Sequence, residues 1–226
     1  MTRQFLWATA ILSLGLASGA VAQDEDEAAA IGDARVGGLV VYGGAELEFT
    51  FPSDGTTQEL SGYAEVESNG FYGGVWALAS KDSDANEVDL YLGYRNETES
   101  GFSYDVSYTR FFYPNDGGDC CGEIGLSLGQ PINDVFGVSL DLAYDPDESI
   151  GAATFGADYA VSEKLSLSAN YGLVELGGAA TEREWDLGAT YGLGEISAVD
   201  LRYYDGSEFD GYVGLSLTYD TTLFGS

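Results

Sequence analysis

One seven-residue pattern recurs along this chain: three apolar residues at alternate positions, followed by a tyrosine. It occurs at Val88–Tyr94, Phe102–Tyr108, Val138–Tyr144, Leu165–Tyr171, Trp185–Tyr191 and Val213–Tyr219. A period of two indicates a β-strand with one apolar face. The opposite face carries Ser, Gly, Asp, Asn and Thr, with almost no Lys. This combination is typical of a strand between lipid and a wet interior, with the tyrosine at the depth of the headgroups.

The first 22 residues have the pattern of a Sec signal peptide. Arg3 supplies the positive start, an apolar run extends from Phe5 to about Ala17, and Ala20-Val21-Ala22 is a cleavage site before Gln23. An anchor helix is the alternative, but the apolar run is short and an acidic stretch follows it. The sequence therefore predicts an exported protein, either a soluble one or a β-barrel of the Gram-negative outer membrane.

Composition excludes several classes of function. The formal charge of −30 disfavours any nucleic-acid partner, although such a charge also suits solubility in a salty medium. The chain has no histidine, which removes the usual catalytic base and the commonest metal ligand, so we expect no enzyme, no metal site and no cofactor. The adjacent Cys120 and Cys121 could form a vicinal disulfide, pair between chains or stay reduced.

Alternation and turn residues divide the chain into an acidic flexible segment at 23–36 and an all-β domain at 37–226. We expect an antiparallel up-and-down transmembrane β-barrel of about twelve strands. An even number places both chain ends on one side, together with the shorter connections. The expected strands are 37–51, 58–67, 71–80, 87–96, 101–113, 120–129, 135–145, 150–160, 165–174, 184–192, 196–204 and 211–220.

The same alternation assigns charged residues to the inside of such a barrel. Where apolar residues hold one phase of a strand, the charged residues in the other phase face the lumen, and a one-residue slip would reverse the assignment. Arg110 shares the apolar phase and is expected at an interface. The predicted lumen residues are Glu46, Glu48, Glu65, Asp89, Asp105, Asp141, Asp158, Asp186, Asp200, Arg95 and Arg202.

The segment from Asn69 to Tyr113 resembles a known bacterial family. Gly70-Phe71-Tyr72-Gly73-Gly74-Val75-Trp76 precedes Glu87-Val88-Asp89-Leu90-Tyr91-Leu92-Gly93-Tyr94 in the order found in the exported Gcw_chp domain, also called the TorF-type porin family. The family's usual Ser-Asp-Tyr-x-x-Arg-Gly opening is replaced here by Gly43-Gly44-Ala45-Glu46-Leu47-Glu48-Phe49. The resemblance implies an outer-membrane barrel and a pore. It supplies no substrate and no catalytic residue.

We therefore expect a porin-like channel in the outer membrane that passes small solutes and prefers cations, since carboxylates in a lumen favour cations. Its partners would be outer-membrane lipid and the permeant solutes or cations. Two alternatives stay open. Lumen acids can hydrogen-bond Tyr, Arg and Asn and simply stiffen the wall. The chain could also be a non-conducting structural or adhesive protein, either a plugged barrel or a β-sandwich.

Overall fold

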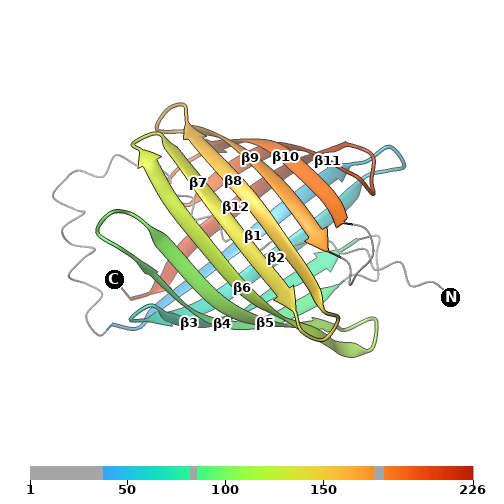
Figure 1. Ribbon diagram of the computed structural model, residues 1–226, viewed down its shortest axis with the longest axis horizontal. Coiled ribbons are helices and arrows are strands. Elements are labelled where there is room, and N and C mark those ends of the chain that lie inside the picture. Colours follow the sequence, from blue (N-terminus) through green and yellow to red (C-terminus); the bar gives the residue numbers. More distant parts are fainter. Residues whose placement is uncertain (1–37, 82–85, 176–180, 226) are drawn as a thin grey trace.

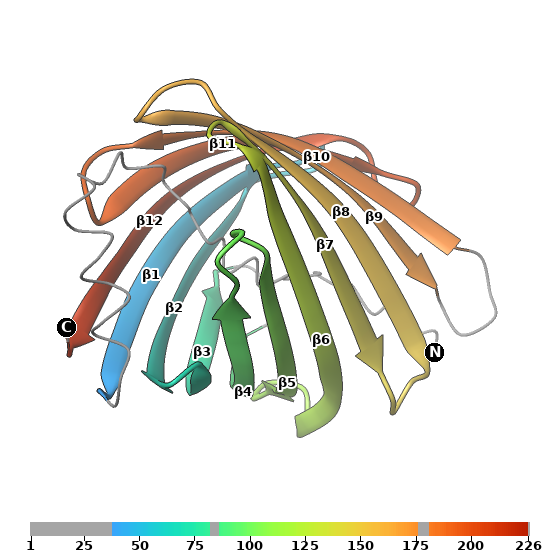
Figure 2. The same ribbon diagram turned by 60° about the vertical axis from the view of Figure 1, so that its left-hand side comes forward.

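The structure, a computed structural model, describes residues 38–81, 86–175 and 181–225. Twelve strands close into an antiparallel barrel in which each strand pairs with its sequence neighbours and β1 pairs with β12 (Figures 1 and 2). The strands are β1 Val40–Phe51, β2 Thr57–Ser68, β3 Phe71–Ser80, β4 Glu87–Glu97, β5 Ser103–Tyr113, β6 Gly118–Asn133, β7 Phe136–Asp145, β8 Ile150–Ala160, β9 Leu165–Glu175, β10 Thr181–Gly192, β11 Ser197–Gly206 and β12 Tyr212–Phe224.

The barrel confirms the predicted fold class and excludes the β-sandwich. Among the described residues, no helix has the length and apolarity needed to cross a membrane. The predicted signal peptide at 1–22 and the acidic segment at 23–36 lie outside the described residues.

One connection differs clearly from the prediction. A five-residue turn was expected at 130–134, but β6 continues to Asn133 and only Asp134 and Val135 join it to β7. The pairing register shifts between Pro131 and Asn133. Because proline has no N–H to donate, a register shift is the kind of place where a strand tolerates it, and the strand is therefore longer than the sequence suggested.

A tight turn between β2 and β3 follows the rule for two-residue hairpins. Ser68 pairs with Phe71, and Asn69 and Gly70 between them have φ angles of 53° and 81°. Two successive positive φ angles define the turn whose twist matches the flanking strands, and Asn-Gly is the sequence that best adopts it. This turn fixes the register between β2 and β3.

The two faces of the sheet differ strongly in chemistry. Large apolar side chains stand exposed in one phase of every strand, as at Leu60 (55%), Leu90 (51%) and Leu201 (53%). A closed sheet has only an outer surface and an interior, so we infer that this apolar phase is the outer face. Apolar side chains on the outer face are suited to contact with lipid, so the barrel needs no conventional apolar core inside.

The tyrosines that close the recurring pattern all lie on the outer face. We call the edge with the short turns and the chain ends the turn rim, and the opposite edge the loop rim. Tyr191 and Tyr219 stand near the turn rim, 49% and 46% exposed, and Tyr144 near the loop rim, 47% exposed. Tyr108 and Tyr171 lie further from the strand ends. The pattern therefore marks the outer face more reliably than it marks the rims.

Candidate functional site

Strand register places all the predicted lumen residues in the phase opposite to the exposed apolar one. One cross-strand row runs through Arg95, Asp105, Ser127 and Asp141 on β4 to β7. A second row runs through Asp158, Ser168, Gly188 and Arg202 on β8 to β11. We infer that this common face is the inner face of the barrel.

Arg95 on β4 joins carboxylates from a strand that is not its neighbour. It forms ion pairs with Glu65 and Glu67, both on β2, so its side chain spans β3. On the way it lies over the ring of Tyr72, 4.6 Å from guanidinium carbon to ring centroid. Glu65 is only 2% exposed. This cluster links three strands of the inner face and leaves little of the arginine's charge uncompensated.

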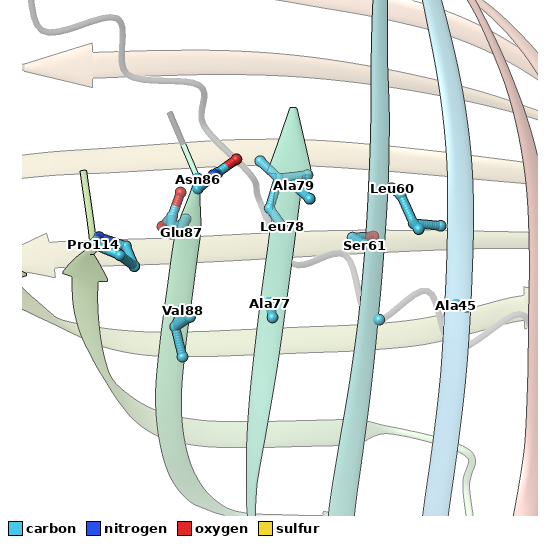
Figure 3. Close-up of a pocket in the computed structure, with 11 residues that line it drawn as sticks. Ala45, Leu60, Ser61, Ala77, Leu78, Ala79, Asn86, Glu87, Val88 and Pro114 are labelled. Carbon is cyan, nitrogen blue, oxygen red and sulfur yellow. The ribbon is translucent and has the colours of Figure 1, made fainter. Parts of the chain in front are cut away.

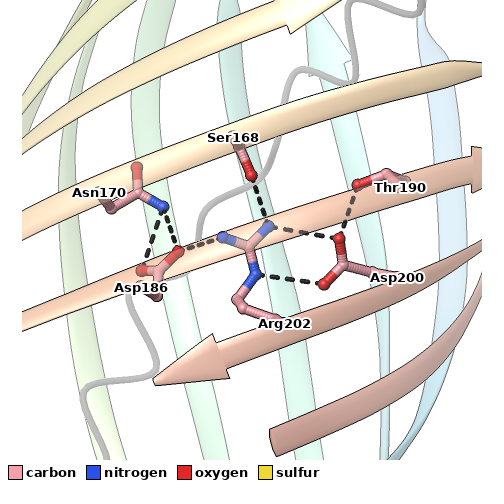
Figure 4. Close-up of polar contacts among 6 residues, drawn as sticks. All are labelled: Ser168, Asn170, Asp186, Thr190, Asp200 and Arg202. Carbon is pink, nitrogen blue, oxygen red and sulfur yellow. Dashed lines mark hydrogen bonds and ion pairs between the residues drawn. The ribbon is translucent and has the colours of Figure 1, made fainter. Parts of the chain in front are cut away.

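Arg202 on β11 forms a second cluster of the same kind (Figure 4). Its guanidinium forms ion pairs with Asp186 and Asp200 and donates to Ser168 Oγ at 2.8 Å. Asn170 Nδ2 donates to Asp186 at 3.0 and 3.2 Å, so that carboxylate is held from two sides. Thr190 Oγ1 donates to Asp200 at 2.7 Å. The cluster spans β9, β10 and β11, nearly across the barrel from Arg95.

A glycine lies beneath Arg202 and beneath two tyrosines of the inner face. A Cβ added at Gly188 would collide with the Arg202 guanidinium. On β3 and β4 the arrangement is reciprocal: Tyr72 lies over Gly93, and Tyr91 lies over Gly74, the residue directly paired with it. Because each tyrosine packs over the glycine of the other strand, the motif that carries the family resemblance has a physical reason for its two Tyr-x-Gly spacings, at Tyr72 and at Tyr91.

The other predicted residues have simpler surroundings. Asp105 accepts a hydrogen bond of 2.6 Å from Tyr72 Oη. Six ion pairs occur in the described part of the chain, and six predicted acids take part in none of them: Glu46, Glu48, Asp89, Asp105, Asp141 and Asp158. The two arginines therefore compensate only part of the inner negative charge.

Sequence reasoning missed several inner-face residues. Register adds carboxylates that share the phase of the predicted ones but stand near strand ends or beside small residues, where the alternation is hard to recognise. It also adds tyrosines whose hydroxyls bind those carboxylates, as Tyr63 Oη does to Asp220 at 2.9 Å. These residues could have been found by continuing the inward and outward alternation of each strand to both of its ends. The added acids include Glu59, Glu67, Glu87, Glu123, Glu184 and Asp220.

Arg110 lies on the outer face, in the phase expected for it. It pairs in register with exposed Leu90, and its guanidinium donates to Asp119 at 2.6 Å and to Asp147 at 3.2 Å, both near the loop rim. In this structure Cys120 and Cys121 are joined by a disulfide, next to the register shift between β5 and β6.

A hollow of about 410 Å³ lies across the first four strands (Figure 3). Small residues make room for it: Ala45, Gly62 and Ala77 are directly paired across β1, β2 and β3. Its lining is mainly apolar and includes the exposed Leu60, so it opens on the outer face rather than into the lumen. Glu87 reaches it from the inner face.

Comparison with known families decides where this chain belongs. The family described as "Bacterial protein of unknown function (Gcw_chp)" matches residues 57–221. This chain belongs to the Gcw_chp family. The resemblance seen in the motif around Tyr72 and Tyr91 is thereby confirmed. A search of curated protein sequences found no match to the chain.

Solved structures similar to this Gcw_chp protein include porins. The KdgM porin aligns with a TM-score of 0.64 at 13% identity, covering 78% of this chain and 98% of KdgM. The NanC porin aligns with a TM-score of 0.63 at 8% identity, covering 80% of this chain and all (100%) of NanC. KdgM is also known in complex with disordered oligogalacturonate, with a TM-score of 0.60. At these identities the likeness shows the fold alone.

Proposed function

We propose that this Gcw_chp protein is an outer-membrane channel that passes small solutes and prefers cations. The observation that carries the proposal is the closed barrel itself, with an apolar outer face and a strongly acidic inner face. A sheet with exposed Leu, Val and Phe all around its outside is suited to lipid, and a charged inner face is suited to water.

Strand length and export support the membrane location. The strands have 10 to 16 residues, against about 9–11 for a tilted transmembrane strand. The predicted signal peptide at 1–22 would export the chain. We therefore propose the Gram-negative outer membrane as its site and lipid as its main partner. The barrel is proposed to act without a cofactor and not as an enzyme.

The charge on the inner face supports cation preference. Both inner arginines are already engaged by two carboxylates each. The remaining carboxylates create a negative potential in a narrow tube, which enriches cations. Oligogalacturonate, found with KdgM, is a polyanion. By its charge, the interior of this Gcw_chp protein is a poor match for such a solute, so we propose neutral or cationic solutes instead.

Single-channel recording of the refolded protein in a planar bilayer tests this proposal. Under a salt gradient the reversal potential should show cation preference, and the preference should fade toward 1 M salt, where the Debye length falls to about 3 Å. The triple change Glu48→Gln, Asp141→Asn and Asp158→Asn should lower the preference, because none of the three is ion-paired. Anion preference would overturn the selectivity. Absence of conductance would favour a non-conducting structural barrel.

A matched control removes the same charge at the loops. The control variant carries Asp54→Asn, Asp116→Asn and Glu148→Gln, at three residues in exposed connections outside the strands. This variant should keep most of the wild-type preference, because loop charges are screened by bulk salt more effectively than charges within the tube. An equal loss in both triple variants would mean that the inner face does not set selectivity.

A further inference from the structure

Three buried side-chain oxygens lack a hydrogen-bond partner in the part of the chain that the structure describes, and all three lie on β2 and β4. They are Glu65 Oε2, Asp89 Oδ1 and Tyr91 Oη. Their residues are 2%, 3% and 6% exposed. Buried polar atoms nearly always have a partner. Glu65 and Tyr91 interact with each other, so Asp89 Oδ1 is the atom that calls for a water, an ion or a ligand.

Asp89 is shielded by aromatic residues and has another carboxylate as its neighbour. The residues paired with it are Trp76 on β3 and Phe111 on β5, so aromatic rings flank its carboxylate. Glu87 is two residues earlier on the same face, is 6% exposed and interacts directly with Asp89. Tyr113 Oη donates to Glu87 at 3.2 Å. Two carboxylates thus share a shielded place at the loop-rim end of β4.

In the described part of the chain, no basic side chain compensates this pair. By contrast, Glu65 is ion-paired with Arg95, and Asp186 and Asp200 are ion-paired with Arg202. Within the described ranges no ion pair includes Glu87 or Asp89. Buried charges are costly unless they are paired, coordinate a metal or take up a proton. The pair therefore calls for a positive partner from outside the chain.

We propose that Glu87 and Asp89 bind one exchangeable divalent cation, with Ca²⁺ preferred over Mg²⁺. A divalent ion matches two carboxylates in charge. Ca²⁺ accepts irregular oxygen shells, whereas Mg²⁺ releases its water reluctantly. Tyr113, which already contacts Glu87, stands at the edge of the site. The proposal that ions occupy this site as they pass through the barrel rests on the proposed channel function.

Binding is expected to be weak. No group of three or more His, Cys, Asp or Glu side chains that could hold a metal collects in the described residues. With two carboxylates, an affinity of about 10⁻⁴–10⁻³ M is expected, as in weak extracellular Ca²⁺ modules. A station in a channel must also release its ion for the next one to pass, so weak binding suits the location.

The first test measures binding without conduction. Thermal unfolding of the full chain in detergent micelles is followed with 0–10 mM CaCl₂ at constant ionic strength. The midpoint should rise by about 4 °C at tenfold the dissociation constant. Asp89→Asn and, separately, Glu87→Gln should abolish the rise. Asp141→Asn, an acid of the same face on β7, should keep it.

The second test measures conduction. In planar bilayers, Ca²⁺ at about 1 mM should halve the K⁺ current of the wild type and of Asp141→Asn, and should leave that of Asp89→Asn unchanged. A Ca²⁺-dependent midpoint without any conductance would keep the site and refute the channel. Normal conductance with equal Ca²⁺ effects in all variants would refute the site and leave the channel proposal intact. The same conclusion follows if the unfolding midpoint responds to protons and not to Ca²⁺.

Discussion

Long side chains on the inner face pass over glycines, and this residue-scale rule has a direct test. A Cβ at Gly93 would lie 2.5 Å from the Tyr72 hydroxyl oxygen and displace that ring. Gly93→Ala should therefore weaken the hydrogen bond from Tyr72 to Asp105 and cost about 1–3 kcal/mol of unfolding free energy. Urea unfolding in micelles measures the loss.

Gly137→Ala is the matched control. Gly137 shares the inner face, but an added Cβ would meet only a carbonyl oxygen of Gln130 at 3.9 Å. Its unfolding free energy should change by no more than about 0.5 kcal/mol. Equal effects at the two glycines would show that Tyr72 does not depend on the space over Gly93.

Arg202 gives a second prediction at the same scale. Arg202→Met removes the positive group between Asp186 and Asp200. Because both carboxylates are left without their main partner in a half-buried place, the change should cost about 1–3 kcal/mol and should increase cation preference. Arg202→Lys should restore charge but not all hydrogen bonds. A Met variant with wild-type stability would mean that the cluster does not brace the wall.

At the scale of the strand, alternation alone predicted most of the fold. Each expected strand exists because its apolar residues recur every second position. The extra length of β6 was missed because Pro131 and Asp134 look like a turn, and only pairing with β7 shows that the strand continues. The partners of Arg95 were also out of reach, since Glu65 and Glu67 lie two strands away and no local pattern records which strands a long side chain spans.

The alternation also predicts how strands tolerate charge. Leu140 lies at the middle of β7 on the outer face, and Ser139 lies beside it on the inner face. Leu140→Arg should cost about 2–4 kcal/mol, as for a charge at the lipid midplane. Leu167→Arg, third in β9 and thus near the turn rim, should cost about 0–1 kcal/mol. Folding yield in liposomes and urea titrations measure both.

Ser139→Arg is the control on the opposite face. Gly129 and Gly156 are its paired neighbours, so the inner face has room for a long side chain there. Its cost should fall well below that of Leu140→Arg. The reverse order would mean that the two faces have been exchanged.

For the whole molecule, closure between β1 and β12 is the decisive contact. Their pairing runs from Val41 with Phe224 to Phe51 with Val213. A chain that ends at Gly211 should leave β1 and β11 with open edges, which lipid does not tolerate. It should therefore lose the heat-modifiable band on gels that marks a folded barrel. Removal of Gly225 and Ser226 alone should preserve that band.

Closure also explains which parts of the site were predictable. Phase assigns residues to a face from each strand alone, so the predicted acids share one face. Which acids are compensated depends on three-dimensional neighbours, as with Asp186 beside Arg202 and Asp89 between two aromatic rings. The sequence therefore indicated an acidic interior, but not which of its acids are ion-paired with an arginine and which are left uncompensated.

The even number of strands has a practical consequence for labelling. Because Val41 at the start of β1 pairs with Phe224 at the end of β12, both ends of the barrel emerge at the turn rim. An epitope fused after Ser226 and one placed before Val40 should report the same compartment, while one inserted at Glu208 in the β11–β12 connection should report the other. Outer-membrane barrels have their short turns in the periplasm. In intact cells an antibody should therefore reach the insertion and neither terminal tag, so the even strand number allows the orientation of the barrel to be read directly.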